Sequence, residues 1–209
     1  MAGLLEVGDL TRRFGDRIVL DGISFEVDAG EICAVVGPNG VGKTTLLRCV
    51  VGADRPDSGW LALAGRTLVE TDPWVRASVA AVLDDIDFFP DLSVREHLDL
   101  LALGHGTPDA AGTVARVVGE LGLDEAQDQL PATLSSGQRR RLALASCFVR
   151  PRRLLVLDEP EQRLDAEGRA WLAGALLAER EAGTAVLMAS HDAELVDEVA
   201  DWRLEFGAE

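Results

Sequence analysis

The stretch EICAVVGPNGVGKTTLLRCVVG, residues 31–52, decides how this chain folds. Residues 31–36 form a short apolar run that ends at a glycine, which is typical of a buried strand. Residues 37–45, GPNGVGKTT, satisfy the pattern GxxxxGK[ST], and the apolar spacing after Lys43 is helical. The stretch therefore predicts a strand, a glycine-rich loop and a helix, an arrangement whose backbone N–H groups bind phosphate.

The residue types in this loop suit a nucleoside triphosphate. Gly37, Gly40 and Gly42 allow the backbone to turn tightly around phosphate oxygens, where a side chain would collide. Lys43 supplies a mobile ammonium for the β- and γ-phosphates, and Thr44 supplies a hydroxyl for Mg²⁺. The predicted binding loop comprises Gly37, Pro38, Asn39, Gly40, Val41, Gly42, Lys43, Thr44 and Thr45. The chain contains no NKxD sequence, so nothing indicates selectivity for guanine.

The composition places this loop in an acidic protein. The 209 residues carry a formal net charge of −16, and Lys43 is the only lysine among the 20 basic residues. An acidic chain repels phosphate backbones, so we do not expect nucleic acid as a partner. With 47% hydrophobic and 27% charged residues, the composition is that of an ordinary globular protein.

The same composition bears on the compartment. The three cysteines are widely spaced, which suggests buried reduced thiols in a cytosolic protein. The first residues have no signal-peptide pattern, and no apolar run approaches the roughly 20 residues that cross a bilayer. We therefore expect a cytoplasmic protein that reaches a membrane only through a partner.

Outward from the phosphate loop, short apolar runs alternate with helical patterns. Strands are predicted at 4–10, 17–27, 31–37, 60–65, 79–83, 152–160, 184–190 and 202–206, with a turn at 12–16 between the first two. Helices are predicted after Lys43 and at 93–104, 109–123, 135–149, 165–181 and 192–200. This alternation predicts an α/β fold with a mostly parallel sheet. The helical block from 93 to 149 interrupts it and is expected to form a subdomain.

Two carboxylates stand at the end of one predicted strand, in LLVLDEP at 154–160. In an open α/β sheet this edge faces the ligand crevice. Asp158 is suited to hold Mg²⁺, and Glu159 to orient and deprotonate an attacking water, a role commonly worth about 10²- to 10⁴-fold. A solvated turn is the alternative for this segment taken alone, but the phosphate loop favours a catalytic edge.

A further motif makes the pattern specific. LSSGQ at 134–138 is followed by RRRLALA and then by LDEP. This order of motifs resembles the ATP-binding cassette (ABC) ATPase family over nearly the whole chain. The resemblance implies one ABC ATPase domain over 1–209, with a P-loop NTPase core and mostly parallel sheet, an N-terminal antiparallel β portion, and an inserted α-helical subdomain at about 93–149.

The resemblance also implies how ATP is bound. In the family, two subunits sandwich two ATP molecules head to tail, and the signature opens a helix that faces a phosphate on the other subunit. The residues that match this signature are Ser135, Ser136, Gly137 and Gln138. Asp165 matches an aspartate that touches the partner's site, and His191 matches a histidine at the γ-phosphate. Phe14 matches the aromatic that stacks on adenine, although a core phenylalanine is the alternative.

Some positions depart from the family pattern. The glutamine that usually ligates Mg²⁺ is replaced by aspartate, which we place at Asp84, with Asp85 as the alternative. Ser136 replaces the first glycine of the signature. Arg139, Arg140 and Arg141 are expected in local salt bridges or subunit contacts, and His97 and His105 are expected on the surface.

The family resemblance leads to one main functional hypothesis. The chain is expected to be a Mg-ATP-hydrolysing subunit that forms a homo- or heterodimer and drives a separate transmembrane permease, in the direction of export. It would then lie on the cytoplasmic face of the membrane, with 88–92 docking the permease; a core role for the two phenylalanines there is the alternative. Other possibilities are a non-transport ATPase that regulates a membrane partner in cell division, or a weakly hydrolysing member of a heterodimer.

Overall fold

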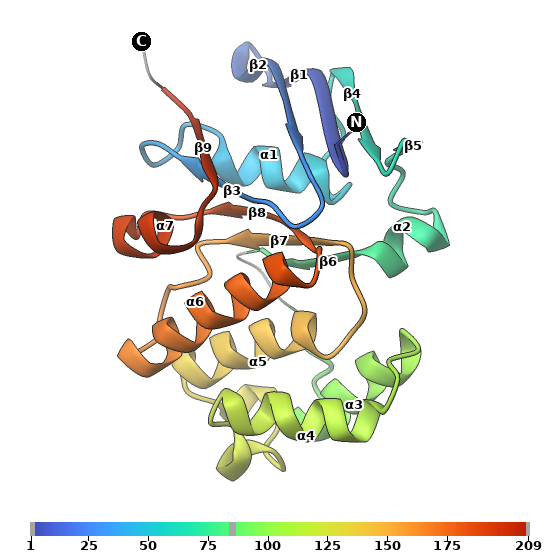
Figure 1. Cartoon of the computed structure of the whole chain (residues 1–209), viewed down its shortest axis with the longest axis vertical. Helices are drawn as coiled ribbons and strands as arrows, with labels where there is room; N and C mark the ends of the chain where they lie inside the picture. The colour runs from blue at the N-terminus through green and yellow to red at the C-terminus, as the bar shows by residue number, and fades with distance from the viewer. Residues whose placement is uncertain (1–2, 84–86, 208–209) are drawn as a thin grey trace.

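The computed structural model describes residues 3–83 and 87–207 of the chain. It consists of layers: an antiparallel sheet, helix α1 (Lys43–Val50), a parallel sheet and then most of the other helices (Figure 1). The parallel sheet has the strand order β6-β7-β8-β3-β9. These strands are β6 (Val79–Val82), β7 (Leu154–Asp158), β8 (Ala185–Ala189), β3 (Ile32–Val36) and β9 (Trp202–Glu205). The predicted α/β fold with a mostly parallel sheet is confirmed.

The register of the three central strands explains where a site can form. Ala189 at the end of β8 pairs with Val35 of β3 on one side and with Asp158 of β7 on the other. Because the three strands are parallel, the loops that follow them begin side by side at one edge of the sheet. The tertiary fold thus gathers the loops that begin near residues 37, 159 and 190.

The antiparallel sheet has the strand order β2-β1-β4-β5. Its strands are β1 (Leu5–Phe14), β2 (Arg17–Val27), β4 (Ser58–Leu63) and β5 (Arg66–Thr67). The predicted turn at 12–16 is too long. Arg13 pairs with Ile18 and Phe14 with Arg17, so the turn consists of Gly15 and Asp16 alone. Cross-strand pairing overrides the local turn signal, and it leaves Phe14 at the tip of a hairpin.

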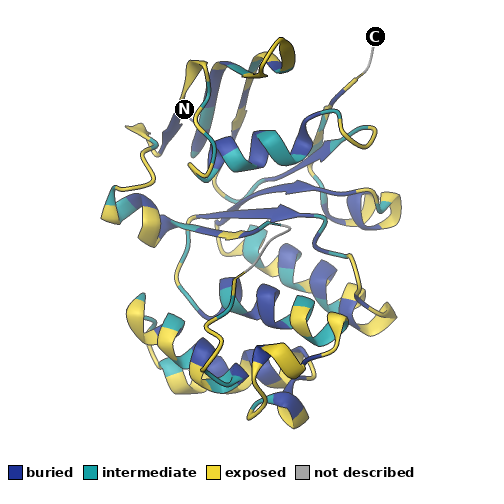
Figure 2. Cartoon of the chain, turned by 180° about the vertical axis from the view of Figure 1, so that it is seen from behind, coloured by how far each residue is buried: buried dark blue, intermediate teal, exposed yellow. Residues whose placement is uncertain are grey.

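Alternating residues of the parallel strands divide the core into two clusters. In β7, Leu154 and Val156 pack with α1 and the antiparallel sheet, while Leu155 and Leu157 pack with the helices on the opposite face. A parallel sheet buried on both faces accounts for the uninterrupted apolar runs in the sequence. Figure 2 shows the three central strands β3, β7 and β8 buried, whereas the covering helices carry exposed residues on their outer sides.

The segment between β6 and β7 is mostly helical, as predicted. It contains α3 (Val94–Gly104), α4 (Ala110–Glu120), two short 3₁₀ turns (Asp124–Ala126 and Pro131–Thr133) and α5 (Ser136–Phe148). Helix α3 begins at a capping box in which Ser93 and Glu96 each accept the other's backbone N–H. The remaining helices are α2 (Pro73–Ser78), α6 (Ala166–Glu181) and α7 (Ala193–Val199).

The surface position expected for His97 is wrong. Its side chain is buried at 4% exposure, and its ring lies 5.4 Å from that of Phe88 and 5.5 Å from that of Phe89. Burial lowers the pKa of His97. The α3 periodicity alone did not reveal this, because the covering rings come from a segment before the helix.

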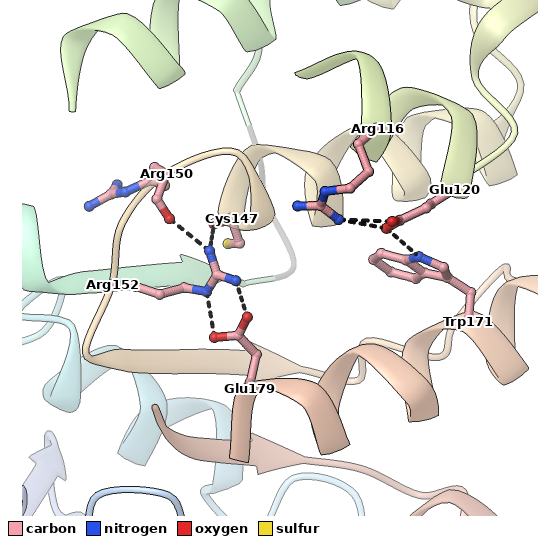
Figure 3. Close-up of polar contacts among 7 residues, drawn as sticks. All are labelled: Arg116, Glu120, Cys147, Arg150, Arg152, Trp171 and Glu179. Carbon is pink, nitrogen blue, oxygen red and sulfur yellow. Dashed lines mark hydrogen bonds and ion pairs between the residues drawn. The ribbon is translucent and has the colours of Figure 1, made fainter. Parts of the chain in front are cut away.

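Two ion pairs on the helices differ sharply in burial (Figure 3). Arg152, in the loop before β7, pairs with Glu179 of α6 at side-chain exposures of 10% and 13%, and it also donates to the carbonyls of Cys147 and Arg150. On α4, Arg116 and Glu120 form an i, i+4 pair at 57% and 40% exposure. Only the first pair is withdrawn from solvent screening, so removal of one partner should destabilise the fold more there than in the exposed pair.

Replacing Glu179 with alanine is expected to lower the free energy of unfolding by about 3 kcal/mol, because Arg152 would keep a buried charge without its carboxylate partner. The control Arg116→Ala is expected to change it by no more than about 0.5 kcal/mol. Urea titration followed by circular dichroism measures both. Equal losses in the two variants would contradict this ranking.

Candidate functional site

The glycine-rich loop between β3 and α1 is held close to other backbone segments. Gly37 has a φ of 146°, and a Cβ placed there would lie 2.4 Å from the carbonyl oxygen of Phe206. Gly42 has a φ of 119°, and its Cβ would lie 2.9 Å from the carbonyl oxygen of Val19. Both positions require glycine for conformation and for space. The loop is therefore fixed by the strands around it, while its centre at Gly40 has open space.

A cavity of about 260 Å³ lies over this loop. Its walls come from the β1–β2 hairpin, the loop, the start of α1 and the end of β7. The lining residues are Phe14, Arg17, Val19, Asn39, Gly40, Gly42, Lys43, Thr44, Thr45 and Glu159. The N-terminus of α1 and two cations thus meet in one open hollow, a combination that attracts an anion such as a triphosphate.

Lys43 lies at the centre of the site and is 6% exposed. Its Nζ donates to the carbonyl oxygens of Gly37 at 2.9 Å and Pro38 at 3.0 Å, and it lies 3.1 Å from Nε2 of His191. An ammonium only donates, so Nε2 of the histidine is the acceptor in this contact. The 3.3 Å approach of the same Nε2 to Glu159 becomes a hydrogen bond only when Nε2 carries a proton.

The acidic end of β7 faces the same site. Asp158 is its last residue and is 1% exposed. Glu159 follows with a φ of 45°, unusual for a residue other than glycine, and its N–H donates to the carbonyl of Ala189 at 2.8 Å. Because the backbone bends at Glu159, Asp158 stays buried at the end of β7 and the carboxylate of Glu159 lines the cavity.

The oxygen donors present suit Mg²⁺ bound together with phosphate. Thr44 offers a hydroxyl from α1 and Asp158 a carboxylate from β7, both hard donors. Among residues 3–83 and 87–207 no group of three or more His, Cys, Asp or Glu gathers as a metal site. Mg²⁺ commonly takes one or two protein ligands and completes its shell with waters and substrate phosphates. The third predicted ligand, Asp84, lies outside the described residues, as does its alternative Asp85.

The signature residues lie away from the cavity described above. Ser135 caps α5 with a capping box: its Oγ accepts from the N–H of Gln138 at 3.2 Å, and Gln138 Oε1 accepts from the N–H of Ser135 at 2.9 Å. Ser135 and Ser136 are exposed. Neither these residues nor Gly137 line the cavity around Lys43. Their helix N-terminus is presented to solvent.

Asp165 also lies outside that cavity. Its carboxylate caps α6 by accepting from the N–H of Gly168 at 2.8 Å and pairs with Arg141 at 2.8 Å. These two interactions, the N–H of Gly168 first, hold the pKa of Asp165 below its usual value. The local salt bridge expected of the arginine run is thus present at Arg141.

Phe14 belongs to the cavity wall and not to the core, since 47% of its side chain is exposed. The guanidinium of Arg12 lies 4.5 Å from its ring centroid and is itself paired with Asp54 and Asp57. An aromatic ring held by a cation at the mouth of an anion-binding hollow is suited to stack on a base.

Two residues that the motifs did not single out, and Arg140 of the arginine run, also shape the site. Arg17 lines the cavity and donates to the carbonyl of Gly40 at 3.0 Å. Glu161 accepts from Ser190 Oγ at 2.7 Å and from the N–H of His191 at 3.2 Å. Arg140 donates to backbone carbonyls in the loop after β7. Their partners are distant in the sequence, so no local pattern pointed to these contacts.

Comparison with known proteins agrees with this architecture. The ABC transporter family pattern matches residues 20–162. The chain is 34% identical to the SkfA peptide export ATP-binding protein SkfE of Bacillus subtilis, over 95% of this chain and 83% of that relative. It is 36% identical to the spermidine/putrescine import ATP-binding protein PotA of Pseudomonas aeruginosa, over 90% of this chain but only 53% of PotA. It thus spans about half of that relative.

A solved structure titled as the ATP binding subunit of an ABC transporter superposes with a TM-score of 0.90 at 25% identity, covering 97% of this chain and 85% of that one. The expected two-sheet core with a helical segment is therefore shared with a solved relative. On the sequence match and on the fold, the chain belongs to the ABC transporter family and is an ATP-binding subunit of that family.

Proposed function

We propose that this protein binds and hydrolyses Mg-ATP as one of two subunits that pair head to tail around two nucleotides and drive a separate transmembrane permease. The observation that carries the proposal is the meeting of Lys43, Glu159 and His191 beside one cavity. A cation can neutralise the phosphates, a carboxylate can accept a proton from the attacking water, and an imidazole can orient that water, so these groups suit hydrolysis of a phosphoanhydride.

Each of these groups has a proposed task. Lys43 neutralises the β- and γ-phosphates, with the backbone N–H groups of 37–45 around them. Glu159 accepts a proton from the attacking water, and His191 orients that water and the γ-phosphate. Thr44 and Asp158, with Asp84 as the third expected ligand, hold Mg²⁺, which supplies neutralisation of phosphate charge when bound.

The exposed N-terminus of α5 supports pairing of two subunits. Ser135, Ser136 and Gly137 form a helix N-terminus suited to an anion, and none of them lines the cavity of their own subunit. A second subunit, identical or related, completes both sites at once in an isologous dimer, with Asp165 and Gln138 near the junction.

The proposed permease partner follows from family membership and from the surface. No helix within residues 3–83 and 87–207 is long and apolar enough to span a membrane. In the expected docking segment, Phe88 packs against the core while Phe89 is 49% exposed, and Leu103 on α3 is 69% exposed. We place the protein on the cytoplasmic face of the membrane. Export is the proposed direction, supported by the match to 83% of a peptide-export relative.

Lys43→Arg is expected to reduce Mg-ATP hydrolysis on the order of 10²-fold or more, because the planar guanidinium cannot replace an ammonium held by two loop carbonyls. Phosphate release measures the rate, and thermal unfolding checks that the fold persists. The control Arg116→Lys, an exposed basic exchange on α4, should leave the rate unchanged. Full activity in Lys43→Arg would refute the role of this residue.

Glu159→Gln is expected to trap an ATP-bound dimer, since it removes the base but keeps the shape of the side chain. Light scattering after size exclusion should show a doubled mass with Mg-ATP and the monomer mass with ADP. A variant that remains monomeric in saturating Mg-ATP would show that the two-subunit arrangement does not apply here.

Phe14→Ala is expected to weaken ATP binding about 10-fold while leaving the affinity for inorganic tripolyphosphate unchanged, because a stacked base contributes on the order of 1–3 kcal/mol. Ile18→Ala is a matched control from the same hairpin, with 43% exposure and no place in the cavity wall. Calorimetric titration measures both ligands. Equal losses for ATP and tripolyphosphate would assign Phe14 to the shape of the loop instead of to the base.

A further inference from the structure

Arg140, in the second turn of α5, reaches across to the loop that follows β7. Its Nη2 donates to the carbonyl oxygens of Asp158 and Glu159, each at 2.6 Å, and its Nε lies 3.4 Å from the carbonyl oxygen of Pro160. One guanidinium therefore contacts the three successive backbone carbonyls of residues 158–160, at the end of β7 and in the loop after it. A planar group with several donors is suited to such a row of acceptors, whereas a lysine ammonium is not.

The residue at the centre of these contacts has an unusual backbone. Glu159 has a φ of 45°, in the left-handed region that a β-carbon disfavours. Its N–H is fixed by the carbonyl of Ala189, and its own carbonyl accepts from Arg140 and from the N–H of Gln162. A disfavoured conformation persists only where surrounding contacts hold it. In this protein the contacts that hold it include a side chain from the signature helix.

We propose that Arg140 is a positioning residue that holds the backbone of Glu159 in this conformation and so aims its carboxylate at the cavity. The proposal rests on the proposed function, in which Glu159 is the base. Because Arg140 follows Ser136 and Gly137 on the same helix, it also links the surface offered to the second subunit's nucleotide with the base of its own site. Small displacements of a catalytic group are costly, on the order of 10²-fold for 1 Å.

The test compares two adjacent arginines. Arg140→Met keeps the length of the aliphatic stem and removes the donors, and we expect it to lower kcat about 10- to 100-fold while changing KM for ATP less than twofold. The matched control Arg139→Met removes a neighbouring guanidinium that is exposed and donates to the carbonyl of Pro131 instead. It should retain the rate. Arg140→Lys should recover only part of the loss, because a point charge does not span the three carbonyls.

A double variant distinguishes positioning from a general loss of structure. In single-turnover experiments, Arg140→Met should add little to the defect of Glu159→Gln, since a misplaced base has no further effect once the base is gone. The proposal would be overturned if the rate losses of the two single variants multiplied in the double variant, or if Arg140→Met had a wild-type kcat. If thermal unfolding shows that Arg140→Met is not folded, Arg140→Lys replaces it in the same comparison. A wild-type kcat in Arg140→Lys would then overturn the proposal.

The same measurements separate this proposal from the function on which it rests. Hydrolysis by the wild type that is lost in Glu159→Gln, together with full activity in Arg140→Met, would refute the positioning role alone. A wild-type protein without Mg-ATP hydrolysis, or a fully active Glu159→Gln, would refute the proposed function first.

Discussion

The close approach of the glycine-rich loop to its neighbours is the constraint on which the rest of the structure depends. Backbone atoms of Phe206 and Val19 lie where a side chain at Gly37 or Gly42 would be. The end of the parallel sheet and the hairpin of the antiparallel sheet therefore meet at one loop. This contact sets the position of α1 between the two sheets and leaves a hollow that Lys43 and the N-terminus of α1 line.

The site gathers positive charge, although the chain as a whole is strongly negative. A protein with a net charge of −16 concentrates its only lysine, a helix N-terminus and Arg17 at one hollow. Lys43 contacts two loop carbonyls and Nε2 of His191, and none of these three contacts is to a carboxylate. Within residues 3–83 and 87–207 no carboxylate pairs with Lys43, so no ion pair in that part of the chain has to break when a triphosphate enters, which limits the reorganisation that binding requires.

Much of the fold was predictable because its signals are local. The strand before Gly37, the helix after Lys43 and the capping box at Ser93 each depend on residues only a few positions apart. The predictions failed where distant segments intervene. The hairpin turn is shorter than expected because Arg13 and Phe14 pair across the sheet, and His97 is buried because Phe88 and Phe89 lie against it.

The sequence by itself determined the alternation of strands and helices, the phosphate loop and the acidic strand end, because these features need only hydrophobic periodicity and fixed spacing. The tertiary structure alone decided which side chains meet. Lys43 and His191 are 148 positions apart, and Arg140 reaches Glu159 from another helix. Such contacts follow from the order of parallel strands and from the packing of α5. A hydrogen bond depends on the distance between two atoms in space. For residues far apart in the sequence, that distance is set only when the folded sheet brings its loops to one edge.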